Sequence, residues 1–475
     1  QTCALPILND YVVLWENDGY AIKNATKQGR KIASVRSERL YFQKSITWAT
    51  LTTGMISCRS SEEGHLFDDK GSSCFMPKKD YNYVLALINS VVGDYFLHIL
   101  NPTMSFQSGN IGALPIVQEK VENNQINILS VANVDLCKND WDSFENSWDF
   151  KKHPLLRNVS TISEAFTQWQ SECDDRFNQL KANEEELNRV FIDIYGLQDE
   201  LTPEVEDKDV TVRKADLQRD IKSLLSYAVG CMFGRYSLDV EGLAYAGGEW
   251  DSSKYQSYIP DADNVIPITD EEYLDDDIVS RLCAWLKAVY GADTLEANLD
   301  YIAKALGNKG STSREIIRNY FLNDFFKDHC QTYSVTGSGK RPIYWLFDSG
   351  KQNGFKALVY LHRYTPDTIG NLRIDYLHKM QRVYESEINR MQDMMDHSGN
   401  AREVAAASKR KDKLAKQLKE CREYDEKISH LALSRIELDL DNGVKVNYRK
   451  LQTAQDGKFY EVLADSKNIM VKEKK

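Results

Sequence analysis

Asn101–Ile116, "NPTMSFQSGNIGALPI", is the stretch whose residue types and spacing come nearest to a known catalytic loop. Enzymes that methylate the exocyclic amine of adenine must flip the base out of the duplex and hold it in a pocket. Their loop has a polar residue, two prolines and an aromatic ring, so that the polar group accepts from the amine while the ring stacks on the base. Here Thr103 replaces the second proline and Met104 replaces the aromatic residue.

The context of this stretch also differs from such a loop. Apolar residues recur at helical spacing from Asp80 to Leu100, which predicts a helix with Asp80 as its N-cap and with Pro102 just beyond its end. Adenine-binding loops follow a strand instead, and we find no glycine-rich turn upstream that could hold S-adenosylmethionine. We therefore predict that these residues do not form a methyltransferase active site, and that 101–116 are a turn and an exit strand closing a domain.

Other catalytic patterns are weaker still. The segment "VTGSGKRP" resembles the end of a phosphate loop, but Ser334 stands where the first glycine is required and Arg341 where a hydroxyl residue is required. We interpret it as an ordinary turn. The eight histidines form no HExxH pattern, and no G-x-S-x-G elbow occurs, so the sequence gives no support for a zinc hydrolase or a serine hydrolase.

The charge is unevenly distributed. The net charge is −11, yet residues 20–44 hold seven Lys and Arg against one acid, whereas residues 261–277 hold eight acids and no base. Because the attraction of phosphate falls off within about 10 Å at 0.1 M salt, one basic face matters more than the total. Residues 20–44 are thus the best candidate for contact with a polyanion, with a solvated surface as the equal alternative.

Residues 402–422 carry eight bases against three acids, and there a solvated helix face with internal i,i+4 pairs is favoured over DNA contact.

Composition limits the class of protein. A chain of 475 residues with 42% hydrophobic content can fold into several domains, and it has no run of about 18 apolar residues that would cross a membrane. Nine cysteines without a CxxC pair indicate reduced, mostly buried thiols in a cytoplasmic protein. The first seven residues, "QTCALPI", look like a translated sequencing adapter, so we expect that the natural N-terminal portion is missing.

The periodicity predicts an α+β chain. Residues 8–126 combine the helix at 80–100 with four strand-like runs, "YVVLWE", "SITWATL", "GMISCR" and "SCFMP". A long amphipathic helix is predicted from Ile162 to Tyr195, where Gly196 stops it. Residues 213–330 indicate further helices with the glycine-rich insert "GLAYAGGEWDSS", and 342–364 predict a β-hairpin. The last large element, 371–430, is expected to be an antiparallel helical hairpin with its turn at Ser398–Asn400.

Several long motifs, in order, resemble one family. "VVLWENDGYAIKN", "YNYVLALINSVVGDYFLHIL", "NPTMSFQSGNIGALPI", "ENSWDFKKHPLL" and "RIELDLDNGVKVNYRKLQ" are similar to the C-terminal part of the BREX-type (PglX) adenine-specific DNA methyltransferases. The resemblance runs over nearly all of residues 9–450. In that family the cofactor loop and the adenine-binding motif precede this region, so no catalytic residue can be transferred to this chain.

The resemblance implies a target-recognition region that binds double-stranded DNA at a short non-palindromic site. A missing N-terminal domain would bind S-adenosyl-L-methionine and methylate one adenine, with other phage-defence proteins as possible partners and no membrane contact. The implied fold is a mixed target-recognition-like domain, then mainly helical regions and the C-terminal helical hairpin. The expected segments are 1–7 (artefact), 8–126 (recognition domain), 127–212 (connector), 213–370 (helices and β-hairpin), 371–430 (helical hairpin) and 431–475 (tail).

The candidate DNA-binding residues follow from the chemistry of each group. Phosphate contacts position a protein on DNA, and Arg, Lys, Asn and Gln read base edges. The candidates for phosphate contact are Lys23, Lys27, Arg30, Lys31, Arg36 and Lys44, and those for base edges are Arg59 and Gln107 in loops. The alternative to an enzyme is a non-catalytic DNA-recognition or scaffold subunit. A nuclease or an ATPase finds no motif in these residues.

Overall fold

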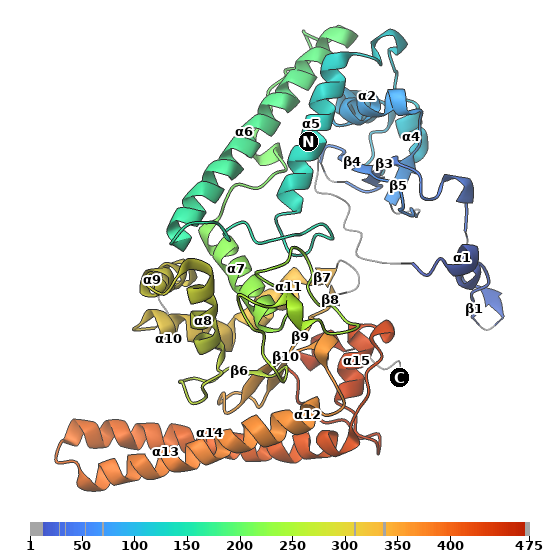
Figure 1. The fold of residues 1–475 in the computed structure, drawn as a ribbon. Coiled ribbons are helices and arrows are strands. Elements are labelled where there is room, and N and C mark those ends of the chain that lie inside the picture. Colours follow the sequence, from blue (N-terminus) through green and yellow to red (C-terminus); the bar gives the residue numbers. More distant parts are fainter. Residues whose placement is uncertain are drawn as a thin grey trace. The chain divides into compact units, whose positions relative to one another are not determined.

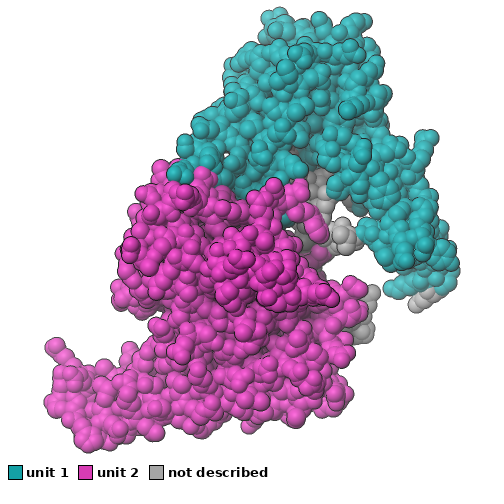
Figure 2. Space-filling model, in the orientation of Figure 1, with its two compact units in different colours: residues 1–147, 168–215 teal, residues 148–167, 216–475 magenta. Residues whose placement is uncertain are grey.

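A computed structural model describes residues 13–27, 29–33, 35–52, 54–68, 71–307, 310–335 and 339–470. The chain forms two compact units, which Figure 2 distinguishes by colour. Unit 1 consists of residues 1–147 and 168–215, and unit 2 of residues 148–167 and 216–475. Helices and small antiparallel sheets make up both, which confirms the α+β class. The finer division into six segments stays a prediction.

The first described elements of unit 1 are α1 (Glu16–Lys23) and a two-stranded ribbon of β1 (Thr26–Lys27) and β2 (Arg30–Lys31) (Figure 1). In the predicted strand "YVVLWE", Tyr11 and Val12 lie outside the described residues, and the rest is not a strand, so that prediction is wrong there. The physical reason is a left-handed run at residues 17–19, with φ of 50°, 59° and 71°, which turns the chain directly after Trp15.

A three-stranded antiparallel sheet in the order β4-β3-β5 is the centre of unit 1. Its strands are β3 (Ser45–Ala49), β4 (Cys58–Ser61) and β5 (Gly71–Cys74). They lie within the predicted runs "SITWATL", "GMISCR" and "SCFMP" or at their edges. Trp48, on β3, is almost fully buried, and its indole N–H donates to the carbonyl oxygen of Phe106 at 2.9 Å.

The helix predicted at 80–100 is two helices, α2 (Lys78–Ile88) and α3 (Val91–Leu100), bent by 80°. The break occurs because the Ser90 side chain accepts from the N–H of Gly93 and so begins a new helix. A Cβ on Gly93 would lie 2.0 Å from the carbonyl oxygen of Leu87, so the bend requires glycine. The predicted N-cap was wrong: Pro77 precedes the first turn, and Asp80 lies within that turn. The predicted end before Pro102 is confirmed.

Of the helices that the structure describes, none is by itself long and apolar enough to cross a bilayer. The bent pair of α2 and α3 reaches that length and apolarity only when taken together. Most of α2 is buried in the core of unit 1, where it contacts α5.

The exit strand predicted within 101–116 is wrong, because its described residues contain a short helix, α4 (Ser108–Gly112). The helix begins there because the Asn110 side chain accepts from the backbone N–H of Gln107 at 2.8 Å. The loop before it is held by Asn101, whose side-chain oxygen accepts from the N–H of Thr103 at 3.1 Å. Ser105 of this loop forms an isolated antiparallel bridge with Leu51, which lies just beyond the end of β3.

Two long helices complete unit 1. The sequence did not predict α5 (Asn124–Trp141), which Asn123 caps by accepting from two backbone N–H groups. The predicted helix at 162–195 is confirmed by α6 (Ile162–Tyr195), and Gly196 follows it with φ of 65°. Residues 162–167 of α6 belong to unit 2 and the remainder to unit 1. Leu187, Phe191 and Ile192 of α6 are buried with α2 in one core.

Unit 2 places helices beside a small antiparallel sheet in the order β6-β10-β9. The predicted hairpin is confirmed by the pairing of β9 (Tyr344–Asp348) with β10 (Lys356–Tyr360). The two ends of the rejected phosphate-loop motif pair with each other as β7 (Ser334–Val335) and β8 (Gly339–Lys340), whereas 336–338 lie outside the described residues. The other elements are β6 (Ile266–Pro267), α7 (Leu217–Met232), α8 (Ile278–Tyr290), α9 (Leu295–Leu306), α10 (Ser313–Asn323) and α11 (Phe325–Thr332).

The predicted helical hairpin is confirmed in unit 2. Its arms are α13 (His378–His397) and α14 (Ala401–Ser434), which lie side by side and extend away from the sheet of unit 2 (Figure 1). The turn falls at the predicted Ser398–Asn400. A short helix α12 (Thr368–Asn371) and a π-helical turn η6 (Leu372–Leu377) precede α13, and η7 (Leu440–Asn442), α15 (Val444–Leu451) and α16 (Ser466–Ile469) follow the hairpin. The remaining short turns are η1 (Glu38–Leu40), η2 (Gln118–Lys120), η3 (Asp207–Asp209), η4 (Ser252–Lys254) and η5 (Leu361–Arg363).

Candidate nucleic-acid interface

The ribbon of β1 and β2 presents three cations, Lys27, Arg30 and Lys31, which we call the basic hairpin. Lys27 lies opposite Arg30, and Thr26 lies opposite Lys31, so the antiparallel pairing of β1 and β2 brings the three cations together. All three are exposed. Among the residues that the structure describes, none of the three forms an ion pair. The basic hairpin can therefore offer its charge to a partner.

Lys23 is held by acids of its own unit. Its ammonium group contacts the carboxylate of Asp18 at 2.9 Å and also pairs with Glu38. The hydrogen bonds to Glu38 and then Asp18 raise the pKa of Lys23. The same group lies 5.6 Å from the ring centre of Trp15. Lys23 thus ties α1 to η1, and less of its charge is available for DNA than we expected from the sequence.

Lys44 is partnered in a similar way. Its ammonium group lies 2.9 Å from a carboxylate oxygen of Glu62 and 4.9 Å from the ring centre of Tyr81. Partial burial is the largest influence on Glu62 and by itself raises the pKa of the carboxyl group. The hydrogen bond and the charge of Lys44, together with the hydrogen bond from Ser60, outweigh burial, so the pKa of Glu62 is lowered. Both side chains remain largely exposed, so water and salt screen the pair.

The other predicted residues are spread over unit 1. Arg36 is exposed between β2 and η1. Arg59 does not lie in a loop as predicted: it is on β4, opposite Thr47 and half-buried, because the pairing of β4 with β3 runs through it. Gln107 lies in a loop as expected, is exposed, and donates to the hydroxyl of Ser105 at 3.2 Å. The structure thus gathers three of the eight candidates in the basic hairpin and leaves the others dispersed.

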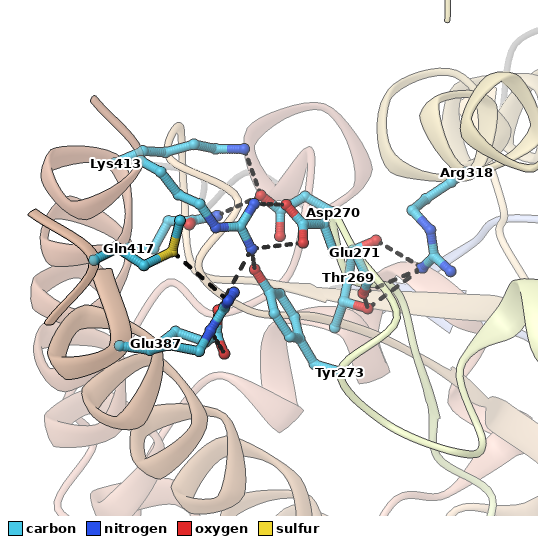
Figure 3. Close-up of polar contacts among 11 residues, drawn as sticks. Thr269, Asp270, Glu271, Tyr273, Arg318, Glu387, Lys413 and Gln417 are labelled. Atoms are coloured by element: carbon cyan, nitrogen blue, oxygen red, sulfur yellow. Dashed lines mark hydrogen bonds and ion pairs between the residues drawn. The ribbon is translucent and has the colours of Figure 1, made fainter. Parts of the chain in front are cut away.

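The second basic stretch, on α14, faces the acidic segment 261–277 of the same unit. We call these contacts the acid–base clamp, made by Asp270, Glu271, Arg410, Lys413 and Gln417. Figure 3 labels Asp270, Glu271, Lys413 and Gln417. Both guanidinium ends of Arg410 reach the carboxylate of Glu271, one of them at 2.6 Å. The carboxylate of Asp270 accepts from Lys413 at 2.5 Å and from Gln417 at 3.0 Å. Positive charge on α14 is therefore matched by acids far away in the sequence.

Pairs between the arms also contribute. Arg422 of α14 donates to Glu385 of α13 at 2.7 Å. Within α14, the i,i+4 pair of Lys419 and Glu423 is longer, at 3.8 Å, and exposed. The favoured interpretation of this helix was a solvated face with internal pairs. The structure corrects the expectation that the ion pairs are internal to the helix, because the shorter contacts join α14 to other elements.

A buried ion pair anchors the acidic segment. Asp277 is fully buried, caps α8 by accepting from the N–H groups of Val279 and Ser280, and pairs with Arg318 of α10. Arg318 also donates to the carbonyl oxygen of Thr269 at 3.1 Å (Figure 3). The acids of the clamp thus belong to a segment that is fixed in position, which lowers the entropy cost of pairing with α14.

Among the described residues, no group of three or more His, Cys, Asp or Glu side chains is arranged to hold a metal ion. The eight described cysteines are free thiols, and six of them are buried, as predicted. The glycine-rich insert follows α7 and leads to the three-residue turn η4, which does not fit the strand–turn–helix cradle of a nucleotide-like cofactor such as S-adenosylmethionine.

Comparison with known proteins identifies the class. No family model matches the chain. It is 46% identical over 456 residues to the adenine-specific methyltransferase PglX of Lacticaseibacillus casei (strain Zhang), which covers 93% of this chain and 37% of that protein. It is 33% identical over 493 residues to the adenine-specific methyltransferase BrxX of Escherichia coli O9:H4 (strain HS), which covers 97% of this chain and 39% of that protein. The relatives are thus adenine-specific methyltransferases.

The chain belongs to the PglX/BrxX family, which confirms the resemblance noted in the sequence. It spans less than two fifths of the length of these curated relatives. Sequence reasoning missed the acid–base clamp, although it identified both of its halves as charge runs of opposite sign. That opposition was the signal that could have predicted the pairing.

Proposed function

We propose that the chain is the target-recognition part of a site-specific DNA adenine-N6 methyltransferase of a phage-defence system. The observation that carries the proposal is the 46% identity, over 93% of the chain, to an adenine-specific methyltransferase. Such an enzyme uses S-adenosyl-L-methionine, which we assign to a domain outside this chain. DNA binding, the cofactor and the defence partners are all parts of the proposal.

Unit 1 is the proposed DNA-binding unit. The basic hairpin supports this assignment, because it presents three exposed cations that have no acidic partner among the described residues. Such cations bind phosphates and release counterions, a contribution that does not depend on sequence. Arg36 is a further proposed phosphate contact. Lys23 and Lys44 would bind a phosphate while they also contact their acidic partners. Arg59 and Gln107 remain proposed readers of base edges.

The proposal is tested by sequencing the methylome of otherwise identical cells with and without the full-length gene. Methylated adenine at one short, non-palindromic site is expected only in cells that carry the gene. A second strain carries Arg30→Ala and Lys31→Ala in the full-length gene, and a matched control carries Arg402→Ala and Lys409→Ala on α14. We expect the first pair to lower the methylated fraction at every site alike and the control pair to leave it unchanged. Identical methylomes with and without the gene would refute the enzyme.

The alternative is a non-catalytic DNA-recognition or scaffold subunit. The Asn-Pro loop is compatible with this function, because Thr103 and Met104 replace the second proline and the aromatic residue of an adenine-binding loop. In the structure this loop is closed by its own hydrogen bonds and leads into α4. The same methylome comparison distinguishes the two functions, because a scaffold subunit that binds the site without methylating it leaves no mark.

A further inference from the structure

Unit 2 contains an arginine that is almost fully buried and that forms no ion pair with any acid in the described part of the chain. Arg235 follows α7 and is 9% exposed. Its guanidinium lies 5.3 Å from the ring centre of Tyr236 and 5.9 Å from that of Tyr333. Its Nε is buried and has no hydrogen-bond partner among the described residues, and no ion pair there reaches the group. Because arginine keeps its proton, a buried guanidinium is strongly unfavourable unless an anion balances it.

His329, on α11, provides a second donor beside this arginine. Its Nε2 accepts from the backbone N–H groups of Ile343 at 3.0 Å and Tyr344 at 3.1 Å. Burial, and then the charge of Arg235, lower the pKa of His329 to about 3, so the ring is neutral at pH 7. Since Nε2 accepts, the single ring proton must be on Nδ1. Nδ1 is buried and, among the described residues, has no acceptor.

The two donors belong to one cluster. The Tyr333 ring, whose centre is 5.9 Å from the Arg235 guanidinium, is 4.9 Å from the His329 ring. His362, in η5, joins the cluster through Tyr360, with ring centres 5.1 Å apart. The Nδ1 of His362 is also buried without a partner in the described part of the chain. The end of α7, the helix α11 and the β9–β10 hairpin thus bring a cation and neutral imidazoles together.

We propose that Arg235 and His329 form a binding site for a small oxyanion, a phosphate or carboxylate group. The Nε–H of Arg235 and the Nδ1–H of His329 both lack acceptors among the described residues, and the charge of Arg235 acts on His329, so one oxyanion that accepts from both would satisfy the two groups. Charge-assisted hydrogen bonds of this kind are short and strong, and the anion neutralises the buried guanidinium. The assignment does not depend on the proposed DNA-binding function, because the cluster lies in unit 2 and the basic hairpin in unit 1.

The experiment titrates the 475-residue chain with inorganic phosphate, and separately with acetate, by calorimetry at an ionic strength held constant with NaCl. One saturating site per chain is expected, and the anion that binds more tightly distinguishes a phosphate group from a carboxylate group. Arg235→Met should weaken this binding about tenfold or more, the loss expected for hydrogen bonds to a charged group. The exposed control Arg402→Met should bind as the unaltered chain does.

Two further measurements make the test decisive. The variant Arg30→Ala with Lys31→Ala should bind the anion as the unaltered chain does. Loss of anion binding in this variant would overturn the assignment, because it would place the anion on the basic hairpin. If Arg235→Met does not fold, equilibrium dialysis of the unaltered chain with radiolabelled phosphate still measures whether the chain binds the anion. One phosphate or acetate bound per chain supports the site. Binding of neither anion, or equal binding by a folded Arg235→Met variant, would overturn it.

Discussion

The basic hairpin of unit 1 and the basic face of α14 in unit 2 carry similar charges in different surroundings. In the basic hairpin, Lys27, Arg30 and Lys31 face no acid among the described residues. On α14, Arg410 and Lys413 face Glu271 and Asp270, about 140 residues away in the chain. A count of charges along the sequence finds both regions but cannot tell which one is already neutralised. Whether a basic side chain is available to bind DNA depends on the acidic side chains that the fold places beside it.

The largest effect is expected where the acidic segment is anchored. Asp277→Ala removes the cap of α8 and leaves Arg318 buried without its carboxylate, so the free energy of unfolding should fall by about 3–5 kcal/mol. Urea unfolding followed by circular dichroism measures this loss. The control, Glu296→Ala, breaks the exposed pair with Arg314 and should lower the free energy of unfolding far less, because water and salt screen that pair. Equal losses for the two variants would contradict a buried anchor for the clamp.

A smaller effect is expected from pH, again in unit 2. Burial lowers the pKa of His153 to about 3, whereas the unfolded chain has an ordinary value near 6.5. Between these values the unfolded state binds more protons, so stability present above about pH 6.5 is lost as the pH falls toward 3. His153 alone should contribute about 2 kcal/mol of that loss between pH 7 and pH 5. In a folded His153→Asn variant, a pH profile as steep as that of the unaltered chain would contradict this.

The clamp itself offers the test that most sharpens the comparison. Asp270→Asn with Glu271→Gln removes the acids that face α14 and releases the charge of Arg410 and Lys413. Stability should fall by only about 1 kcal/mol, because these contacts are partly exposed. Binding of a 20-base-pair duplex, measured by fluorescence anisotropy, should become tighter and its salt dependence steeper by about two phosphate contacts. Unchanged DNA binding would show that Asp270 and Glu271 do not limit the positive charge that α14 offers to DNA.

Much of the fold could be predicted wherever periodicity was strong. Helix α6 runs from Ile162 to Tyr195 as predicted, because its apolar stripe is continuous and Gly196 ends it. The bend between α2 and α3 was missed because apolar spacing continues across Asn89 and Ser90, and the capping bond of Ser90 is invisible to periodicity. Helix α4 was missed because five residues have too little pattern, and a side-chain cap begins it.

The sequence could predict which basic residues the candidate site contains, but it could not predict which acids they pair with. The charge of residues 20–44 pointed to the basic hairpin, but the run of positive φ angles at 17–19 brings Asp18 to Lys23, and sequence spacing does not reveal this. Arg59 was expected in a loop, whereas strand pairing extends through it. The clamp depends on how the segment 261–277 folds back toward α14, which is a long-range contact that local rules cannot supply.

The central claim is that the cations of the basic hairpin, rather than those of α14, contact DNA. The most direct test measures the affinity of the chain for one duplex over a series of salt concentrations, with two variants. Arg30→Ala with Lys31→Ala should weaken binding to all sequences alike and reduce the salt slope by about two. Arg402→Ala with Lys409→Ala, on α14, should leave affinity and slope unchanged. An unchanged slope for the hairpin variant, or a reduced slope for the α14 variant alone, would contradict the account.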